Sequence, residues 1–105
     1  MNKTIRKKLI QIITSCCKPE KIILFGSYAR GDRSKNSDID LLVLFNGLKD
    51  ERKITGNFYK LLLESDISVP VDILAMDTKK YNALKNVKGY IYRTIKNEGR
   101  VLYGI

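Results

Sequence analysis

The sequence of 105 residues supports one domain, residues 1–105, with a single modest hydrophobic core. Its formal net charge of +9 suits a polyanionic ligand or an acidic protein partner, but a direct nucleic-acid substrate is not expected because the basic residues are scattered and lack interleaved aromatic residues. The absence of histidine excludes a four-ligand zinc site and a Ser-His-Asp triad within this chain, and no apolar run approaches the roughly 20 residues of a membrane-spanning helix.

The N-terminal segment has apolar residues at helical spacing and is predicted to be a helix that stops before Pro19. Its apolar face consists of Ile5, Leu9, Ile12, Ile13 and Cys16. Basic residues crowd its first turn, and we interpret them as solvated surface or as a contact for an acidic partner. Cys16 and Cys17 are adjacent, so a disulfide between them is not expected, and both are predicted to be small buried side chains. The apolar runs are too short and interrupted for a signal peptide, and a cytoplasmic location is expected.

Residues 21–25 are predicted to form a central strand, because they are fully apolar after Lys21. Gly26 follows directly and permits both a sharp turn and a close approach of backbone to a ligand. Ser27 is predicted to cap a short helix over residues 28–30, and the free amides at such a helix start suit a phosphate. The alternative is that Ser27 only caps the helix.

Residues 31–37 are polar and lack periodicity, which predicts a surface loop. Arg30, Arg33 and Lys35 are candidates to neutralise phosphate charge, and Arg30 is the strongest because it is nearest to Ser27. Arg33 and Lys35 are otherwise ordinary solvated residues, and Asp32 is interpreted as a loop or capping carboxylate.

Residues 38–45 are predicted to form a second strand, with Asp38, Asp40, Leu42 and Leu44 on one face. The Cα atoms of the two aspartates should lie about 7 Å apart, so both carboxylates can reach one cation or a closely spaced pair. Without a cation, the two like charges repel each other and lose hydration. Because this face is polar only at its start, we expect a site at one end of the sheet with core behind it.

Helical spacing predicts a further helix over residues 50–63, followed by a strand over residues 69–76. In that strand Asp72 points away from the face formed by Val69, Val71, Ile73 and Ala75. An ionised carboxylate in so apolar a strand needs a partner, and the site of Asp38 and Asp40 is one candidate. A salt bridge with a distant lysine is the alternative.

The C-terminal segment begins with Asp77 and Thr78, which can cap a helix. A buried stripe is predicted in that helix, and Gly89 bends or divides it; the stripe consists of Leu84, Val87, Ile91 and Ile95. A glycine cap at Gly99 ends the helix, and residues 101–103 form a short extended tail. We therefore expect an α/β (α+β) fold with a small mixed sheet of three or more strands flanked by about four helices.

Three aspartates on two strands beside a phosphate-suited turn describe a two-metal phosphoryl-transfer site composed of Asp38, Asp40 and Asp72. Mg²⁺ is the preferred ion because it takes oxygen ligands and no softer ligand is available there.

The arrangement Gly26-Ser27, ten residues, then Asp38-x-Asp40 closely resembles the nucleotidyltransferase superfamily that includes DNA polymerase beta. Within it the chain resembles, over nearly its whole length, the minimal nucleotidyltransferases, the MNT half of HEPN–MNT toxin–antitoxin pairs. The resemblance implies a nucleotidyltransferase-like fold and two Mg²⁺ ions held by Asp38 and Asp40, with Asp72 as ligand or general base. It also implies that Gly26 and Ser27 contact the triphosphate of ATP, which Arg30 is placed to assist.

The resemblance further implies transfer of AMP from ATP to a tyrosine hydroxyl of a cognate HEPN toxin, an RNase, so that the chain acts as an antitoxin. Two alternatives remain open. The chain either neutralises its toxin by stoichiometric binding, with weak or absent catalysis, or is a small-molecule nucleotidyltransferase of the aminoglycoside kind.

Overall fold

One mixed sheet is formed by four strands in the computed structural model, which describes residues 1–32 and 37–104: β1 (Lys21–Phe25), β2 (Ile39–Phe45), β3 (Val71–Asp77) and β4 (Arg100–Tyr103). The strand order is β3-β2-β1-β4, with β1 antiparallel to both β2 and β4 and β2 parallel to β3. The described helices are α1 (Lys3–Cys16), α2 (Gly26–Arg30), α3 (Glu51–Glu64), α4 (Thr78–Leu84) and α5 (Ile91–Glu98). The predicted mixed sheet is confirmed, and the expected extended tail is an edge strand paired with β1.

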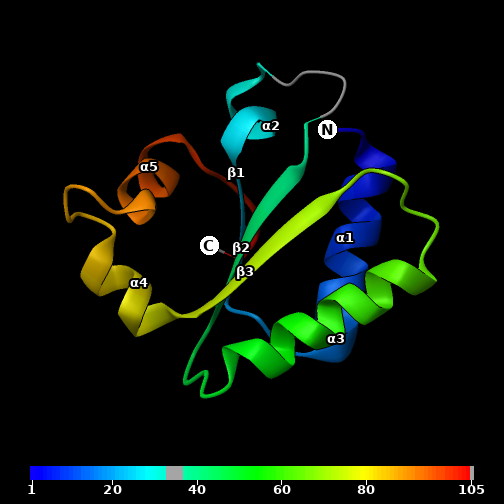
Figure 1. Ribbon diagram of the computed structural model, residues 1–105, viewed down its shortest axis with the longest axis horizontal. Helices are drawn as coiled ribbons and strands as arrows, with labels where there is room; N and C mark the ends of the chain where they lie inside the picture. The colour runs from blue at the N-terminus through cyan, green and yellow to red at the C-terminus, as the bar shows by residue number, and fades with distance from the viewer. Residues whose placement is uncertain (33–36, 105) are drawn as a thin grey trace.

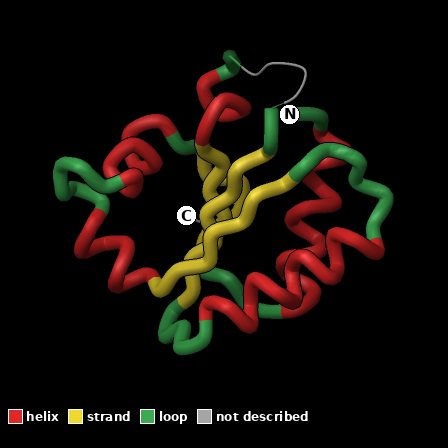
Figure 2. The backbone as a smooth tube through the Cα atoms, viewed as in Figure 1, coloured by secondary structure: helices red, strands yellow, loops and turns green. Residues whose placement is uncertain are grey.

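Helices cover both faces of the sheet, with α1 and α3 on one side and α4 and α5 on the other (Figures 1 and 2). Because successive strand residues face opposite ways, β2 divides its side chains between the two resulting cores. Ile39, Leu41, Val43 and Phe45 enter the larger core under α1 and α3, and Leu42 and Leu44 enter the smaller core under α4 and α5. This is the alternation that the sequence predicts, and it places Asp40 on the same face as the smaller core.

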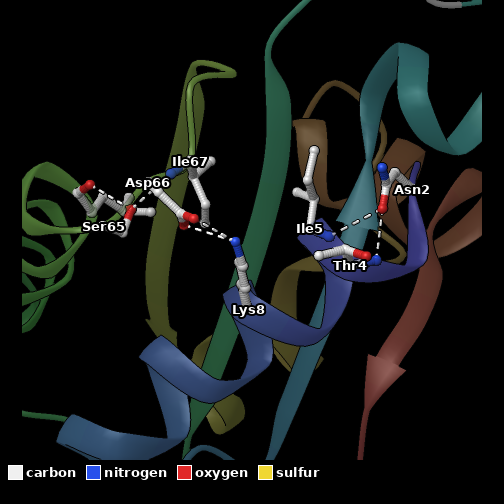
Figure 3. Close-up of polar contacts among 8 residues, drawn as sticks. Asn2, Thr4, Ile5, Lys8, Ser65, Asp66 and Ile67 are labelled. Carbon is white, nitrogen blue, oxygen red and sulfur yellow. Dashed lines mark hydrogen bonds and ion pairs between the residues drawn. The ribbon is translucent and has the colours of Figure 1, made fainter.

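The start of α1 is held by side-chain contacts at both its N-cap and its first turns (Figure 3). The Oδ1 atom of Asn2 accepts hydrogen bonds from the amides of Thr4 at 2.6 Å and Ile5 at 3.4 Å, satisfying donors that the helix leaves unpaired. Lys8 forms an ion pair with Asp66 at 2.7 Å, which ties α1 to the segment after α3. At least one residue of the basic first turns therefore has an acidic partner within the chain.

Asp77 joins the end of β3 to two neighbouring segments. Its carboxylate accepts hydrogen bonds from the amides of Gly47 at 2.7 Å and Leu48 at 2.9 Å, and it caps α4 through the amide of Lys79 at 3.1 Å. Desolvation alone would raise the pKa of Asp77, but these amide hydrogen bonds lower it below its ordinary value. The predicted capping role is confirmed, and the contact with the turn after β2 is an addition that only the folded chain reveals.

Two sequence predictions about buried residues are wrong in part. Cys16, the last residue of α1, is exposed, and Cys17 is half-buried against the larger core. The predicted C-terminal stripe is interrupted between α4 and α5, where Gly89 lies, so Val87 and Ile91 are exposed. Ile95 is buried in the smaller core as the predicted stripe requires, together with Tyr81, and half-buried Tyr92 packs against them.

Within the described residues, no helix is both long enough and apolar enough to cross a bilayer.

Candidate functional site

Asp40 and Asp72 are direct neighbours on adjacent parallel strands. The register of β2 and β3 pairs Asp40 with Asp72, so both side chains lie on one face of the sheet, and Asp38 stands just before β2. Partial burial raises the pKa of Asp40, and the charges of Asp72 and Asp38 raise it further, whereas the Arg30 charge lowers it. The structure therefore brings the three predicted aspartates to one end of the sheet, where their charges act on one another.

The three aspartates differ in exposure, and this corrects one premise of the sequence argument. Asp38 and Asp72 are exposed and Asp40 is half-buried, because β3 is an edge strand whose outer face is uncovered beside Asp72. Because Asp72 is exposed to solvent, its charge does not need a partner within the chain. Its described polar contact is the Tyr59 hydroxyl at 3.5 Å rather than a lysine. Among the residues that the structure describes, no three acidic side chains converge into a ready-made metal-ligand cluster.

Gly26 lies directly beneath the carboxylate of Asp40. Phe25 is paired with Asp40 across β1 and β2, so the next residue along the chain turns under the aspartate side chain. A Cβ atom at Gly26 would stand 2.3 Å from the Oδ2 atom of Asp40, and the backbone has φ +73°. Both the left-handed backbone and the lack of space require glycine, which places main chain next to the acidic side chains.

Ser27 belongs to α2 and does not cap it, contrary to the prediction. The helix begins two residues earlier than expected, at Gly26, so the N-cap position falls on Phe25 and carries no side-chain capping hydrogen bond. The carbonyl of Ser27 accepts hydrogen bonds from the amides of Gly31 at 2.9 Å and Asp32 at 3.1 Å, closing the helix end. Ser27 is half-buried and lies in the first turn beside Gly26, and its side chain is not needed for capping.

Arg30 is an exposed cation held between two carboxylates. Its Nε atom donates to Asp32 at 3.1 Å, and its guanidinium reaches Glu98 of α5 at 3.5 Å. These contacts raise the pKa of Arg30, with the Asp32 hydrogen bond as the largest cause. Asp32, interpreted as a loop or capping carboxylate, is therefore a partner of Arg30. Arg33 and Lys35, the other predicted phosphate contacts, lie outside the described residues.

Tyr59 of α3 is the site residue that the sequence analysis missed. Its hydroxyl accepts a hydrogen bond from the amide of Ile73 at 2.9 Å and faces the Oδ1 atom of Asp72 at 3.5 Å. Because the hydroxyl already accepts from the amide, its own proton is available to the carboxylate. No spacing rule could identify this contact, since it depends on how α3 packs against the edge of β3.

The donor set fits a hard divalent cation. Asp38, Asp40 and Asp72 supply only carboxylate oxygens, and these suit Mg²⁺ better than softer metals. Burial and then the charges of Asp72 and Asp38 raise the pKa of Asp40, and a bound cation would offset both effects. Neighbouring main chain at Gly26 and the guanidinium of Arg30 complete a surface suited to a phosphate-bearing molecule.

Comparisons with known proteins identify the family of this chain. The chain is 39% identical over 84 residues to MJ0604 of Methanocaldococcus jannaschii, which is assigned by name to the protein adenylyltransferases, and the match covers 80% of this chain and 78% of that protein. The fold resembles that of a toxin–antitoxin MntA–HpeT mutant, with a TM-score of 0.70, 24% identity, and coverage of 100% of this chain and 75% of that chain. It also resembles a chain in the complex of a tri-AMPylated Shewanella oneidensis HEPN toxin with its MNT antitoxin, with a TM-score of 0.58, 23% identity, and coverage of 100% and 74%. Residues 4–102 match the model of the nucleotidyltransferase domain family, and the chain therefore belongs to that family of enzymes.

Proposed function

We propose that this nucleotidyltransferase, as one minimal catalytic domain over residues 1–105, transfers AMP from ATP to a tyrosine hydroxyl of a cognate HEPN-domain RNase and thereby acts as a cytoplasmic antitoxin. The observation that carries the proposal is the in-register pair of Asp40 and Asp72, with Asp38 beside it and Gly26 beneath it. Two comparisons support the acceptor: the name of MJ0604, and the AMP carried by the HEPN toxin in the Shewanella oneidensis complex.

Each residue has a defined part in the proposed reaction. Asp38, Asp40 and Asp72 would hold the expected two Mg²⁺ ions, which when bound supply charge neutralisation and polarisation of the phosphoryl group. Gly26, Ser27 and Arg30 would contact the triphosphate. The acceptor oxygen forms a bond with the α-phosphorus, the bond to the bridging oxygen breaks, and pyrophosphate leaves with that electron pair. Asp72, exposed at the strand edge, accepts the proton of the acceptor hydroxyl.

The test uses ATP labelled at the α-phosphate, Mg²⁺ and the HEPN-domain protein encoded beside this chain. We expect label on the HEPN protein with the wild-type chain and none with the double variant Asp38→Ala and Asp40→Ala. Asp66→Ala is the matched control, because it removes an exposed aspartate whose described partner is Lys8 and which has no described contact with Asp38, Asp40 or Asp72. Label that survives the double variant would overturn the assignment.

Two further outcomes separate the alternatives. Tight complex formation without transfer would make the chain a binding antitoxin. Transfer to an aminoglycoside in place of protein would make it a small-molecule enzyme.

A further inference from the structure

Two hollows flank Tyr59 along the outer edge of the sheet, where α3 meets β3. The first has a volume of about 390 Å³, and its lining includes Tyr59, Leu63 and Val71. The second has a volume of about 430 Å³, and its lining includes Glu51, Arg52, Tyr59, Ile73 and Leu74. Tyr59 lines both, so the two hollows adjoin at its side chain, and we name the strip formed by their lining residues the β3 edge surface.

The β3 edge surface runs past the acidic site. Val71 lines one hollow and Ile73 lines the other, and Asp72 lies between them in the sequence. The hydroxyl of Tyr59, the residue at the centre of the strip, contacts the carboxylate of Asp72. A molecule that presents a hydroxyl group to Asp72 from the open edge of the sheet is therefore within reach of this strip.

Large apolar side chains are exposed along the strip. Leu63 is 87% exposed, the highest value among the exposed large hydrophobic residues of the described chain, and Leu74 and Tyr59 are 42% and 37% exposed. Single exposed apolar residues are common on proteins, but these three border two adjoining hollows. Covering them would remove apolar surface from water at roughly 25 cal/mol per Å².

The character of the strip favours a protein as its occupant. One acidic and one basic residue, Glu51 and Arg52, line the hollows, and Glu51 is already paired with Lys80 at 3.8 Å. The strip is therefore nearly neutral in a chain of net charge +9, which does not suit a polyanion. Strand addition is also obstructed, because the Tyr59 hydroxyl occupies the amide of Ile73 at the edge.

We propose that the β3 edge surface is the docking site for the acceptor protein, which inserts apolar side chains into the two hollows and so places its acceptor hydroxyl at Asp72. This inference rests on the proposed function for the identity of the acceptor. Binding energy at protein interfaces concentrates in a few buried apolar anchors, and Leu63 and Leu74 have the position and exposure to be such anchors.

The experiment compares Leu63→Gln and Leu74→Gln with Val87→Gln and Ile91→Gln. The control residues are similarly apolar and are 40% and 51% exposed. Val87 lies in the segment between α4 and α5, and Ile91 is the first residue of α5, so neither belongs to the β3 edge surface. The probe is the HEPN-domain protein encoded beside this chain, and its Kd for each variant is measured by calorimetry. Binding of a non-hydrolysable ATP analogue is measured in parallel.

We expect the two edge variants to weaken HEPN-protein binding by roughly tenfold or more, with nucleotide binding unchanged and the two controls at the wild-type Kd. Edge variants that bind like the controls, or a wild-type chain that forms no complex, would overturn the docking site. A complex that forms and depends on Leu63 and Leu74 while no AMP is transferred would uphold the docking site and overturn the proposed function. The two proposals therefore fail independently.

Discussion

Replacing Gly26 with alanine tests the relation between the glycine turn and the acidic site. The new Cβ atom would lie 2.3 Å from the Oδ2 atom of Asp40, whereas an ordinary carbon–oxygen contact needs roughly 3.3 Å or more. The carboxylate is the free end of a side chain, so it can rotate away by about 1 Å while the strands stay paired. The backbone at φ +73° adds strain of about 1–2 kcal/mol for a residue with a Cβ atom.

The variant should therefore remain folded but lose activity. Displacement of a reacting group by about 1 Å is enough to reduce the rate roughly 100-fold, which is the loss of AMP transfer that we expect. The strain should lower Tm by about 4–8 °C for each kcal/mol. Transfer of labelled AMP gives the first quantity, thermal unfolding gives the second, and Mn²⁺ binding gives a readout of the carboxylates that does not depend on turnover.

Gly47→Ala is the matched control for this experiment. Gly47 has nearly the same backbone, with φ +78°, but a Cβ atom there would meet nothing within 4 Å. Both variants should lose similar stability, and only Gly26→Ala should lose transfer and Mn²⁺ affinity. Equal activity in the two variants would refute the reasoning, because the contact between Gly26 and Asp40 would then have no bearing on the site.

Three further variants test other contacts. Asp40→Asn should be more stable than wild type at neutral pH without divalent cations, because folding raises the pKa of Asp40 and the wild type loses stability as pH rises through that folded-state pKa. The difference in free energy of unfolding, measured by urea titration, should close as pH falls below about 3.8. A variant less stable than wild type at neutral pH would contradict this. Tyr59→Phe should lower the free energy of unfolding by about 0.5–1.5 kcal/mol, because the hydrogen bond from the amide of Ile73 is lost. Hydrogen exchange of that amide should become faster, and unchanged protection from exchange would refute the contact. Asp77→Ala should destabilise the chain at neutral pH, because the pKa of Asp77 is lower in the folded state than in the unfolded state. The stability that Asp77 contributes is present at pH values above its unfolded-state pKa and disappears as pH falls through its folded-state pKa. A loss of Tm that persists in acid would argue against this origin.

Local patterns in the sequence were sufficient for the main elements and for the acidic face. Strand periodicity put Asp38 and Asp40 on one face with Leu42 and Leu44, and put Asp72 opposite Val71 and Ile73, because the direction of a strand side chain depends only on position along the strand. The helix over Glu51–Glu64 and the strand Lys21–Phe25 were predicted within a residue or two for the same local reason.

Tertiary structure decided what no local pattern contains. The register of two strands separated by a helix set Asp40 beside Asp72, and the packing of α3 against an open edge set Tyr59 against that aspartate. Exposure of Asp72 and burial of Tyr81 depend on which helix covers which part of the sheet. The order of residues within a segment fixes its periodicity, whereas burial and long-range contacts arise from the relative placement of segments far apart in the chain.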